Sequence, residues 1–200
     1  MENYEKETIA AIATALSDSG IGIVRISGEN AIYIVDSIFR SASGKKILTK
    51  VQSHMIHYGY IVDKDENIID EVMTSVMKAP KSYTMEDTVE INCHGGVLVM
   101  QKVLETVLQA GARLAEPGEF TKRAFLNGRI DLSRAEAVID VIHSQNEYAL
   151  SSSVSQLKGR LSDKIRSLRE DILYQIAFIE SALDDPEHIS LEGYPEQLAE

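Results

Sequence analysis

Charged side chains inside otherwise apolar runs are the first candidates for chemistry in this sequence. Arg25 interrupts the apolar run at residues 21–26, where an arginine either extends to solvent or meets an anion. Glu90 shares one side of an expected strand at 88–93 with Thr88 and Asn92. A carboxylate and a guanidinium can both bind a polar ligand. Both are also common as solvated charges on a protein surface. The residue types alone leave the two interpretations open.

A second candidate is the run Cys93-His94-Gly95-Gly96, which begins with a nucleophile beside a base. Consecutive strand residues point to opposite faces, so the two side chains cannot meet as a dyad, and Cys93 is predicted to lie in the core. No second ligand stands at helical or strand spacing from His94, which argues against a metal site. The two glycines precede an expected helix and either surround an anion with N–H groups or let strand and helix pack closely.

These residues must be positioned by a mixture of strands and helices. Short apolar or alternating runs predict strands at 8–14, 21–26, 54–62, 68–77 and 88–93, with the third and fourth forming a hairpin around the turn at 63–67. Helical spacing predicts helices from 27 or 28 to 39 and from 97 to 110. The strand-like stretch 112–115 that follows completes a β-α-β unit.

Two loops have open interpretations. Residues 40–50 form a basic loop, and the basic patch at 40–46 within it is either solvated or in contact with RNA. Residues 78–87 form a loop constrained by Pro80, and Tyr83 within it either lies over the mouth of a pocket or packs against the protein.

Residues 116–137 join this mixed region to a wholly helical one. A short helix is expected at 119–127, ended by Gly128, with Phe120, Ala124 and Phe125 on one face. Ser133 is expected to cap the next helix, with Glu136 completing a capping box. We therefore predict an α+β protein: a mixed β-sheet domain with helices at 1–127 and part of an all-α domain at 128–200.

The helical region is predicted to contain one long apolar stripe. Apolar residues recur every three or four positions from Val154 to Leu183, a length typical of a bundle or coiled-coil seam, and Asp184 to Pro186 end it. A single arm cannot cover its own seam, so a further segment or a second copy is expected to do so. The acidic tail at 188–200 is expected to be disordered.

Composition limits the classes of function. The chain has 200 residues and a net charge of −11, which disfavours tight nucleic-acid binding by this chain alone. Its one cysteine excludes an internal disulfide. No apolar run is long enough for a membrane span and the N-terminus lacks a basic region, so we expect a cytoplasmic protein without membrane association.

Four segments carry a resemblance to a known family. Residues 115–137, together with 8–14, 20–28 and the stretch from 79–84 through 90–96, resemble the MnmE (TrmE) family of tRNA-modifying GTPases. The resemblance extends from residue 8 to about residue 145. It departs from the family pattern at 15–19, which replace a Pro/Gly-rich turn, and at Met85, where glycine is usual.

The resemblance implies a folate site. The family's N-terminal domain resembles the folate-binding domain of glycine-cleavage aminomethyltransferases and binds a tetrahydrofolate derivative, 5-formyl- or 5,10-methylene-tetrahydrofolate. Arg25, Glu90 and Arg129 match its folate contacts. A carboxylate such as Glu90 can accept two adjacent N–H groups of a pterin, while Arg25 and Arg129 suit the polar and anionic parts, including the benzoyl-glutamate tail.

The resemblance also implies a larger protein. The family forms homodimers through this domain and, with its partner MnmG, modifies the wobble uridine of tRNA at carbon 5. No G-x-x-x-x-G-K-[ST] motif occurs, so this part is not expected to hydrolyse GTP, and a GTPase domain using K⁺ and Mg²⁺ is expected beyond residue 200. We expect no catalytic residue or metal site in this part. The alternatives are a dimerisation scaffold without ligand binding and a stand-alone folate-dependent one-carbon transferase, for which Glu90 is the one acid or base candidate.

Overall fold

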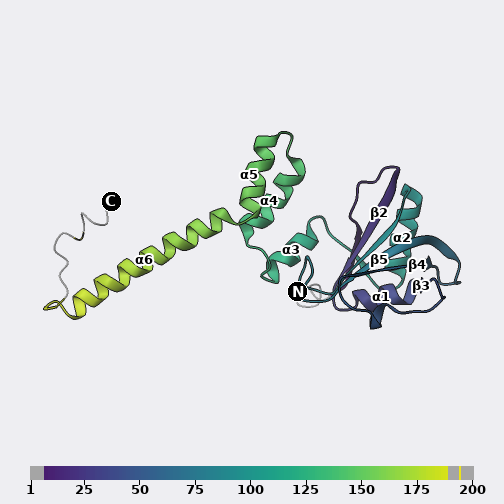
Figure 1. The fold of residues 1–200 in the computed structure, drawn as a ribbon, viewed down its shortest axis with the longest axis horizontal. Helices are drawn as coiled ribbons and strands as arrows, with labels where there is room; N and C mark the ends of the chain where they lie inside the picture. Colours follow the sequence, from purple (N-terminus) through teal and green to yellow (C-terminus); the bar gives the residue numbers. More distant parts are fainter. Residues whose placement is uncertain (1–6, 189–193, 195–200) are drawn as a thin grey trace. The chain divides into compact units, whose positions relative to one another are not determined.

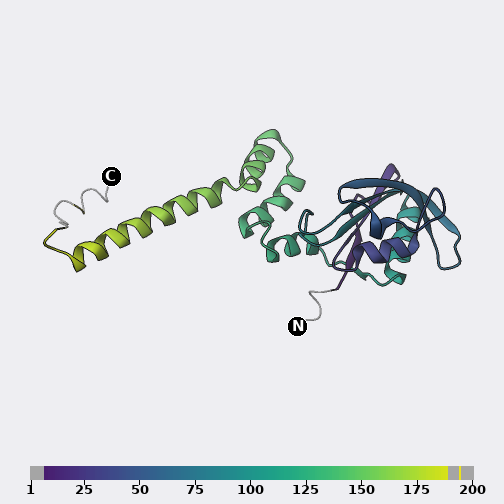
Figure 2. The same cartoon turned by 60° about the horizontal axis from the view of Figure 1, so that its bottom comes forward.

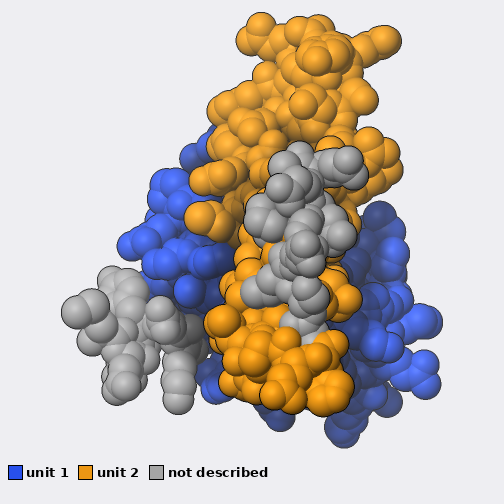
Figure 3. All heavy atoms as spheres, turned by 90° about the vertical axis from the view of Figure 1, so that its left-hand side faces the viewer, with its two compact units in different colours: residues 1–130 blue, residues 131–200 orange. Residues whose placement is uncertain are grey.

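The chain forms two compact units, residues 1–130 and residues 131–200, which are coloured separately in Figure 3. The computed structural model describes residues 7–188 and 194. Unit 1 holds a mixed sheet with helices and unit 2 is helical, so the predicted α+β class is confirmed.

Unit 1 is built on a seven-stranded sheet with the order β3-β4-β5-β6-β2-β1-β7. Every neighbouring pair is antiparallel except β1 and β7, which are parallel. The strands β6 and β7 are therefore parallel to each other and connected through a helix, as the predicted β-α-β unit requires. The strands are β1 (Ile9–Ile12), β2 (Ser19–Ser27), β3 (Phe39–Ser41), β4 (Met55–Val62), β5 (Ile68–Met77), β6 (Thr88–Gly95) and β7 (Arg113–Leu114).

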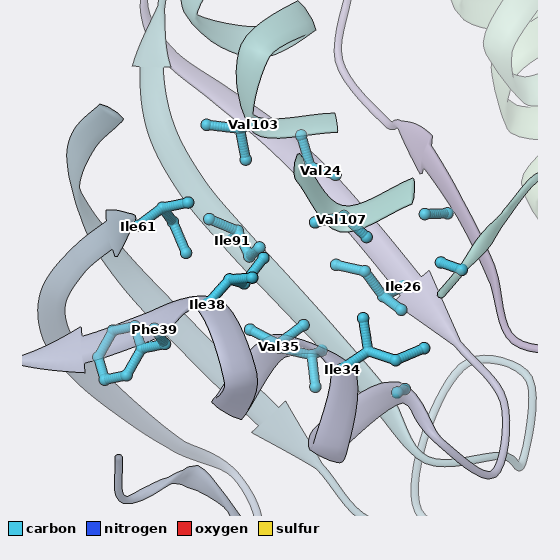
Figure 4. Packing of buried hydrophobic residues seen from close by; sticks show 14 of the residues in the cluster. Val24, Ile26, Ile34, Val35, Ile38, Phe39, Ile61, Ile91, Val103 and Val107 are labelled. Atoms are coloured by element: carbon cyan, nitrogen blue, oxygen red, sulfur yellow. The ribbon is translucent and has the colours of Figure 1, made fainter. Parts of the chain in front are cut away.

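Two helices cover one face of this sheet, α1 (Ala31–Ile38) and α2 (Val97–Gln109) (Figures 1 and 2). Alternate residues of each strand point toward them because side chains alternate along a strand. In β2, Val24 and Ile26 are buried while Arg25 between them is not. Figure 4 shows Val24 and Ile26 packed with Val35 and Val107 of the two helices. The core therefore lies between the sheet and the two helices.

Neither α1 nor α2 covers the opposite face of the sheet. It exposes large apolar side chains from neighbouring strands, and the register places Ile23, Asn92, Met73 and Tyr58 in one row across β2, β6, β5 and β4. We call the exposed apolar part of it the open face; it consists of Ile21, Ile56, Tyr58 and Met73. Exposed apolar area of this kind marks an interaction surface more often than a solvated one.

The structure corrects three predictions in unit 1. The first helix begins at Ala31 rather than at 27 or 28, because β2 continues through Ser27. It ends at Ile38, since Phe39 enters β3 and is fully buried. Residues 40–50 are therefore not a simple loop: they begin in β3 and include a short 3-10 turn, η2 (Leu48–Lys50).

The joint helix α3 (Glu119–Leu126) also differs from its prediction. Its buried residues are Glu119, Arg123 and Ala124, whereas Phe125 is exposed. The predicted apolar face is therefore only partly buried, because charged partners elsewhere in unit 1 bury Glu119 and Arg123 instead. Gly128 ends the helix with φ of +77°, as predicted.

Unit 2 contains three helices in the described residues: α4 (Leu132–His143), α5 (Glu147–Leu157) and α6 (Arg160–Asp184). The cap of α4 is Asp131, whose side chain accepts a hydrogen bond from the Arg134 backbone N–H, so the prediction of Ser133 was wrong. The predicted single stripe is divided between α5 and α6 at Gly159, which has φ of +85°. Helix α6 ends at Asp184 as predicted.

The predicted tail at 188–200 lies outside the described residues except for His188 and Tyr194. Within the described part of the chain, no helix is both long and apolar enough to cross a membrane.

Candidate functional site

The two sequence candidates on the sheet, Arg25 and Glu90, form an ion pair. They are direct register partners on β2 and β6, and their side chains share the sheet face opposite the helices. Arg25 Nε donates to Glu90 Oε1 at 2.8 Å. The side chains are 29% and 23% exposed, so both remain accessible to a ligand. Alternation along two antiparallel strands is enough to bring them together.

Tyr83 connects this pair to the third predicted residue, Arg129. The guanidinium carbon of Arg129 lies 4.9 Å from the centre of the Tyr83 ring, and that of Arg25 lies 5.6 Å from it. Arg25 is also 5.6 Å from the ring centre of Phe120. Such contacts attract a cation to an aromatic face and hold a guanidinium in place. Arg25, Glu90 and Arg129 are thus brought to one place in unit 1, although they come from β2, β6 and the segment after α3.

Tyr83 is itself held between its loop and α3. Its hydroxyl lies 2.9 Å from Thr121 Oγ1, and Asn127 Nδ2 donates to the carbonyl of Thr84 at 2.6 Å. These bonds attach the loop at 78–87 to both ends of the joint helix. The sequence placed Tyr83 either over a pocket or in packing, and the structure shows a ring that contacts both arginines.

A buried network of charged side chains also holds α3 against the rest of unit 1. Arg123 donates to Glu86 at 3.2 Å, to Glu119 at 3.0 Å and to the backbone carbonyl of Glu7 at 2.8 Å. Ser27 at the end of β2 also donates to Glu86, at 2.7 Å. Sequence reasoning missed this network. Its signal was the four-residue spacing of Glu119 and Arg123, which places them on one helix face.

Glu119 is strongly stabilised in its charged form. Burial alone would raise its pKa, but hydrogen bonds from Arg113, the Glu116 backbone N–H and Arg123 lower the pKa to about 2. The carboxylate is therefore ionised at neutral pH and compensates two guanidinium groups. The network links β7, the loop before α3 and α3 itself.

A shallow hollow of about 520 Å³ lies beside Tyr83 and Arg129. We call it the tail hollow, and it is lined by His54, Met77, Pro80, Lys81, Ser82, Tyr83, Met85 and Arg129. Met85 has φ of +62°, a left-handed conformation that is cheapest for glycine. This backbone geometry explains physically why glycine suits that position.

The remaining candidates are structural. Cys93 is buried, and burial raises the pKa of its thiol to about 11, so the prediction of a core cysteine is confirmed. His94 points the other way and lies 2.7 Å from Asp70, whose hydrogen bond raises the pKa of the imidazole. A Cβ on Gly95 would come within 2.5 Å of the Ser19 carbonyl oxygen, which supports the close-packing interpretation of the glycine pair. No metal-binding cluster of His, Cys, Asp or Glu occurs within the described residues.

Comparison with known proteins agrees with this division of the chain. The family described as "GTP-binding protein TrmE N-terminus" matches residues 8–129, and the family described as "MnmE helical domain" matches residues 132–199. Together they define an N-terminal sheet domain followed by a helical domain. The chain belongs to the MnmE (TrmE) family.

Individual relatives carry the name tRNA modification GTPase MnmE. The chain is 64% identical to that of Lachnoclostridium phytofermentans over 192 residues, which is 96% of this chain and 42% of the relative. It is 56% identical to that of Geobacillus kaustophilus over 97% of this chain, and 51% identical to that of Bacillus subtilis over 96%, in both cases covering 42% of the relative. The chain therefore spans about two fifths of the length of these relatives.

Proposed function

We propose that unit 1 binds a tetrahydrofolate derivative, and that the chain is the N-terminal part of a GTPase that modifies tRNA. In the whole protein this part would deliver the one-carbon unit for modification of the wobble uridine at carbon 5, in a homodimer and together with MnmG. The GTPase activity, with Mg²⁺ and K⁺, would belong to a separate domain. Membership of the family and the names of its relatives support this proposal.

The observation that carries the folate proposal is the meeting of Arg25, Glu90 and Arg129 around Tyr83. Glu90 uses Oε1 for Arg25, and no other donor among the described residues hydrogen-bonds this carboxylate. Its second oxygen can therefore accept an N–H group of a pterin, while the two guanidinium groups can hold carbonyl or carboxylate oxygens. A flat ring would also find an aromatic surface in Tyr83.

Calorimetric titration with 5-formyltetrahydrofolate tests this site. Glu90→Gln keeps the shape of the side chain but removes its charge, and we expect affinity to fall by about 10- to 100-fold, the worth of a hydrogen bond to a charged group. Glu66→Gln is the matched control, because Glu66 also accepts from an arginine Nε, that of Arg40 at 2.9 Å, on an unrelated part of the surface. Equal affinities in the two variants would remove Glu90 from the site.

The open face favours a second role, that of a dimerisation surface. Ile21, Ile56, Tyr58 and Met73 are exposed together on one sheet face, and apolar area of this kind is stabilised by a partner. A dimerisation scaffold without ligand binding would use this surface alone. Sedimentation with and without folate separates the roles: a scaffold dimerises fully without folate and gives no binding heat, whereas a folate-linked dimer becomes tighter when folate is added.

A stand-alone one-carbon transferase needs an acid or base beside the folate. Glu90 is the one candidate for this role, and its carboxylate is already paired with Arg25. Transfer activity of the chain without any other protein would support this alternative over the first proposal.

A further inference from the structure

The tail hollow is cationic in a chain that is strongly acidic overall. Three of its lining residues, His54, Lys81 and Arg129, carry nitrogen donors, whereas no carboxylate lines it in the described part of the chain. The chain as a whole has 31 acidic and 20 basic side chains. The lining of the hollow therefore differs in charge from the chain's overall composition. A site of this charge favours an anion.

The cations of the hollow are also not neutralised by the protein. Arg25, Arg40, Arg113 and Arg123 are each paired with a glutamate. Lys81 and Arg129 have no carboxylate partner among the described residues, and Arg129 instead lies on the Tyr83 ring. Their charge is therefore available to a ligand.

A second hollow nearby has the opposite character. It has a volume of about 560 Å³, and its lining includes Glu29, Glu86 and Asp87. Met85 lines both hollows. A flexible anionic chain that leaves Arg129 would therefore be repelled from one hollow and attracted into the other.

We propose that the tail hollow binds the chain of γ-linked glutamates on a folate, with Lys81 as the residue that selects ligands with more than one glutamate. This inference depends on the proposed folate site, since Tyr83 and Arg129 belong to both. A ligand whose ring system pairs with Glu90 would pass along Tyr83, place its first carboxylate at Arg129 and extend toward Lys81 and His54. Each added γ-glutamyl unit brings one carboxylate. The volume of the hollow, about 520 Å³, is large enough to hold more than one such unit.

The test compares 5-formyltetrahydrofolate carrying one glutamate with the same compound carrying three. Calorimetry on the wild-type chain is expected to give about tenfold tighter binding for the triglutamate, since each partly exposed charge pair contributes about twofold to fivefold. The gain should shrink strongly in 0.5 M salt, because screening acts within a few ångströms at that concentration.

Variants assign the gain to the hollow. Lys81→Ala is expected to remove most of the triglutamate advantage and to leave the monoglutamate affinity within about twofold. Lys46→Ala, at an exposed lysine outside the hollow, should behave as the wild type. An undiminished advantage in Lys81→Ala would overturn the proposal.

The outcomes separate the two levels of inference. Monoglutamate binding without any triglutamate advantage in the wild type would overturn the tail hollow and leave the folate site intact. Absence of binding by both compounds would overturn both. A third outcome is that the triglutamate binds no more tightly than the monoglutamate, and that tRNA at an equal concentration of charges displaces it. That outcome would assign the hollow to the phosphates of a nucleic acid instead.

Discussion

The two units of the chain use apolar residues in opposite ways. Unit 1 buries a continuous core of valine, isoleucine and phenylalanine between one face of its sheet and two helices. In unit 2 the buried residues of the described part are small, namely Ala137, Ser153, Gly159 and Ala182. In the same part no larger apolar side chain is buried, and those exposed along α6 are Leu161, Ile165, Leu168, Ile172, Leu173, Tyr174, Ile176 and Leu183.

This difference shows which unit carries its own stability. A helix is stabilised in proteins mainly by packing of its apolar face, and propensity alone gives a marginal helix in water. Unit 1 meets that requirement with its own residues, whereas the apolar stripe of α6 requires a covering surface. The open face of unit 1 also exposes apolar side chains, but unit 1 has a buried core of its own.

The sharpest test substitutes the same residue type in the two units. Ile91 is fully buried in β6, and Ile91→Ala is expected to lower the free energy of unfolding by about 4 kcal/mol, the usual cost of a large cavity in a core. Ile165 in α6 is 58% exposed, and Ile165→Ala is expected to change it by less than about 0.5 kcal/mol. Urea unfolding followed by circular dichroism measures both.

A large loss of unfolding free energy in Ile165→Ala would contradict this difference between the two units. It would mean that the stripe of α6 is covered in solution, and the loss should then depend on protein concentration if a second copy covers it. A small loss in Ile91→Ala would contradict the assignment of the core.

The polar interior of unit 1 gives the next largest effect, and it depends on pH. The pKa of Glu119 is lowered from its ordinary 4.5 to about 2, so its contribution to stability is complete above about pH 5 and is lost as the pH falls toward 2. The shift corresponds to about 3 kcal/mol. We expect the acid limb of the unfolding free energy to be less steep in Glu119→Gln than in the wild type.

The difference between the two curves is the useful quantity, because other carboxylates titrate in both proteins. Parallel acid limbs in wild type and Glu119→Gln would show that the carboxylate is not held by Arg113 and Arg123.

Much of the fold could be predicted because its signals are local. Alternation in β2, β4, β5 and β6 has a period of two, and each of these predicted strands was confirmed. The residues predicted to share a face do so, Val24 with Ile26 in β2 and Val89 with Ile91 and Cys93 in β6, and all five are buried. What failed depends on partners distant in the sequence. The buried face of α3 is polar because Arg113 and Glu86 meet it, and the helical pattern of α3 alone favours its aromatic residues.

The candidate site divides in the same way. Family resemblance selected Arg25 and Glu90 from among ordinary surface charges, and their pairing follows from strand register. Arg129 was selected by family resemblance, and its position follows from the contact with Tyr83, 46 residues earlier, which no spacing rule predicts. The tail hollow was missed because its residues come from segments that are distant in the sequence. In the Arg123 network only the Glu119–Arg123 spacing is a helical signal, and other partners come from β2, β7 and the loop at 78–87.

The smallest effect concerns the start of unit 2, where sequence and structure disagree about the cap. Asp131 accepts from the Arg134 backbone N–H at 2.9 Å and from Ser162 at 2.6 Å, and chiefly the latter bond lowers its pKa to about 2. Asp131→Ala should therefore destabilise α4 by about 1 kcal/mol, seen as faster amide hydrogen exchange at 132–143. Ser133→Ala is the matched control with a smaller effect, because the Ser133 hydroxyl bonds to the side chains of Asp131 and Ser162 and accepts from no backbone N–H of α4 among the described residues. Faster exchange in Ser133→Ala than in Asp131→Ala would show that Ser133 is the cap, as the sequence predicts. The start of unit 2 would then be predictable from its local sequence, as the strands of unit 1 were.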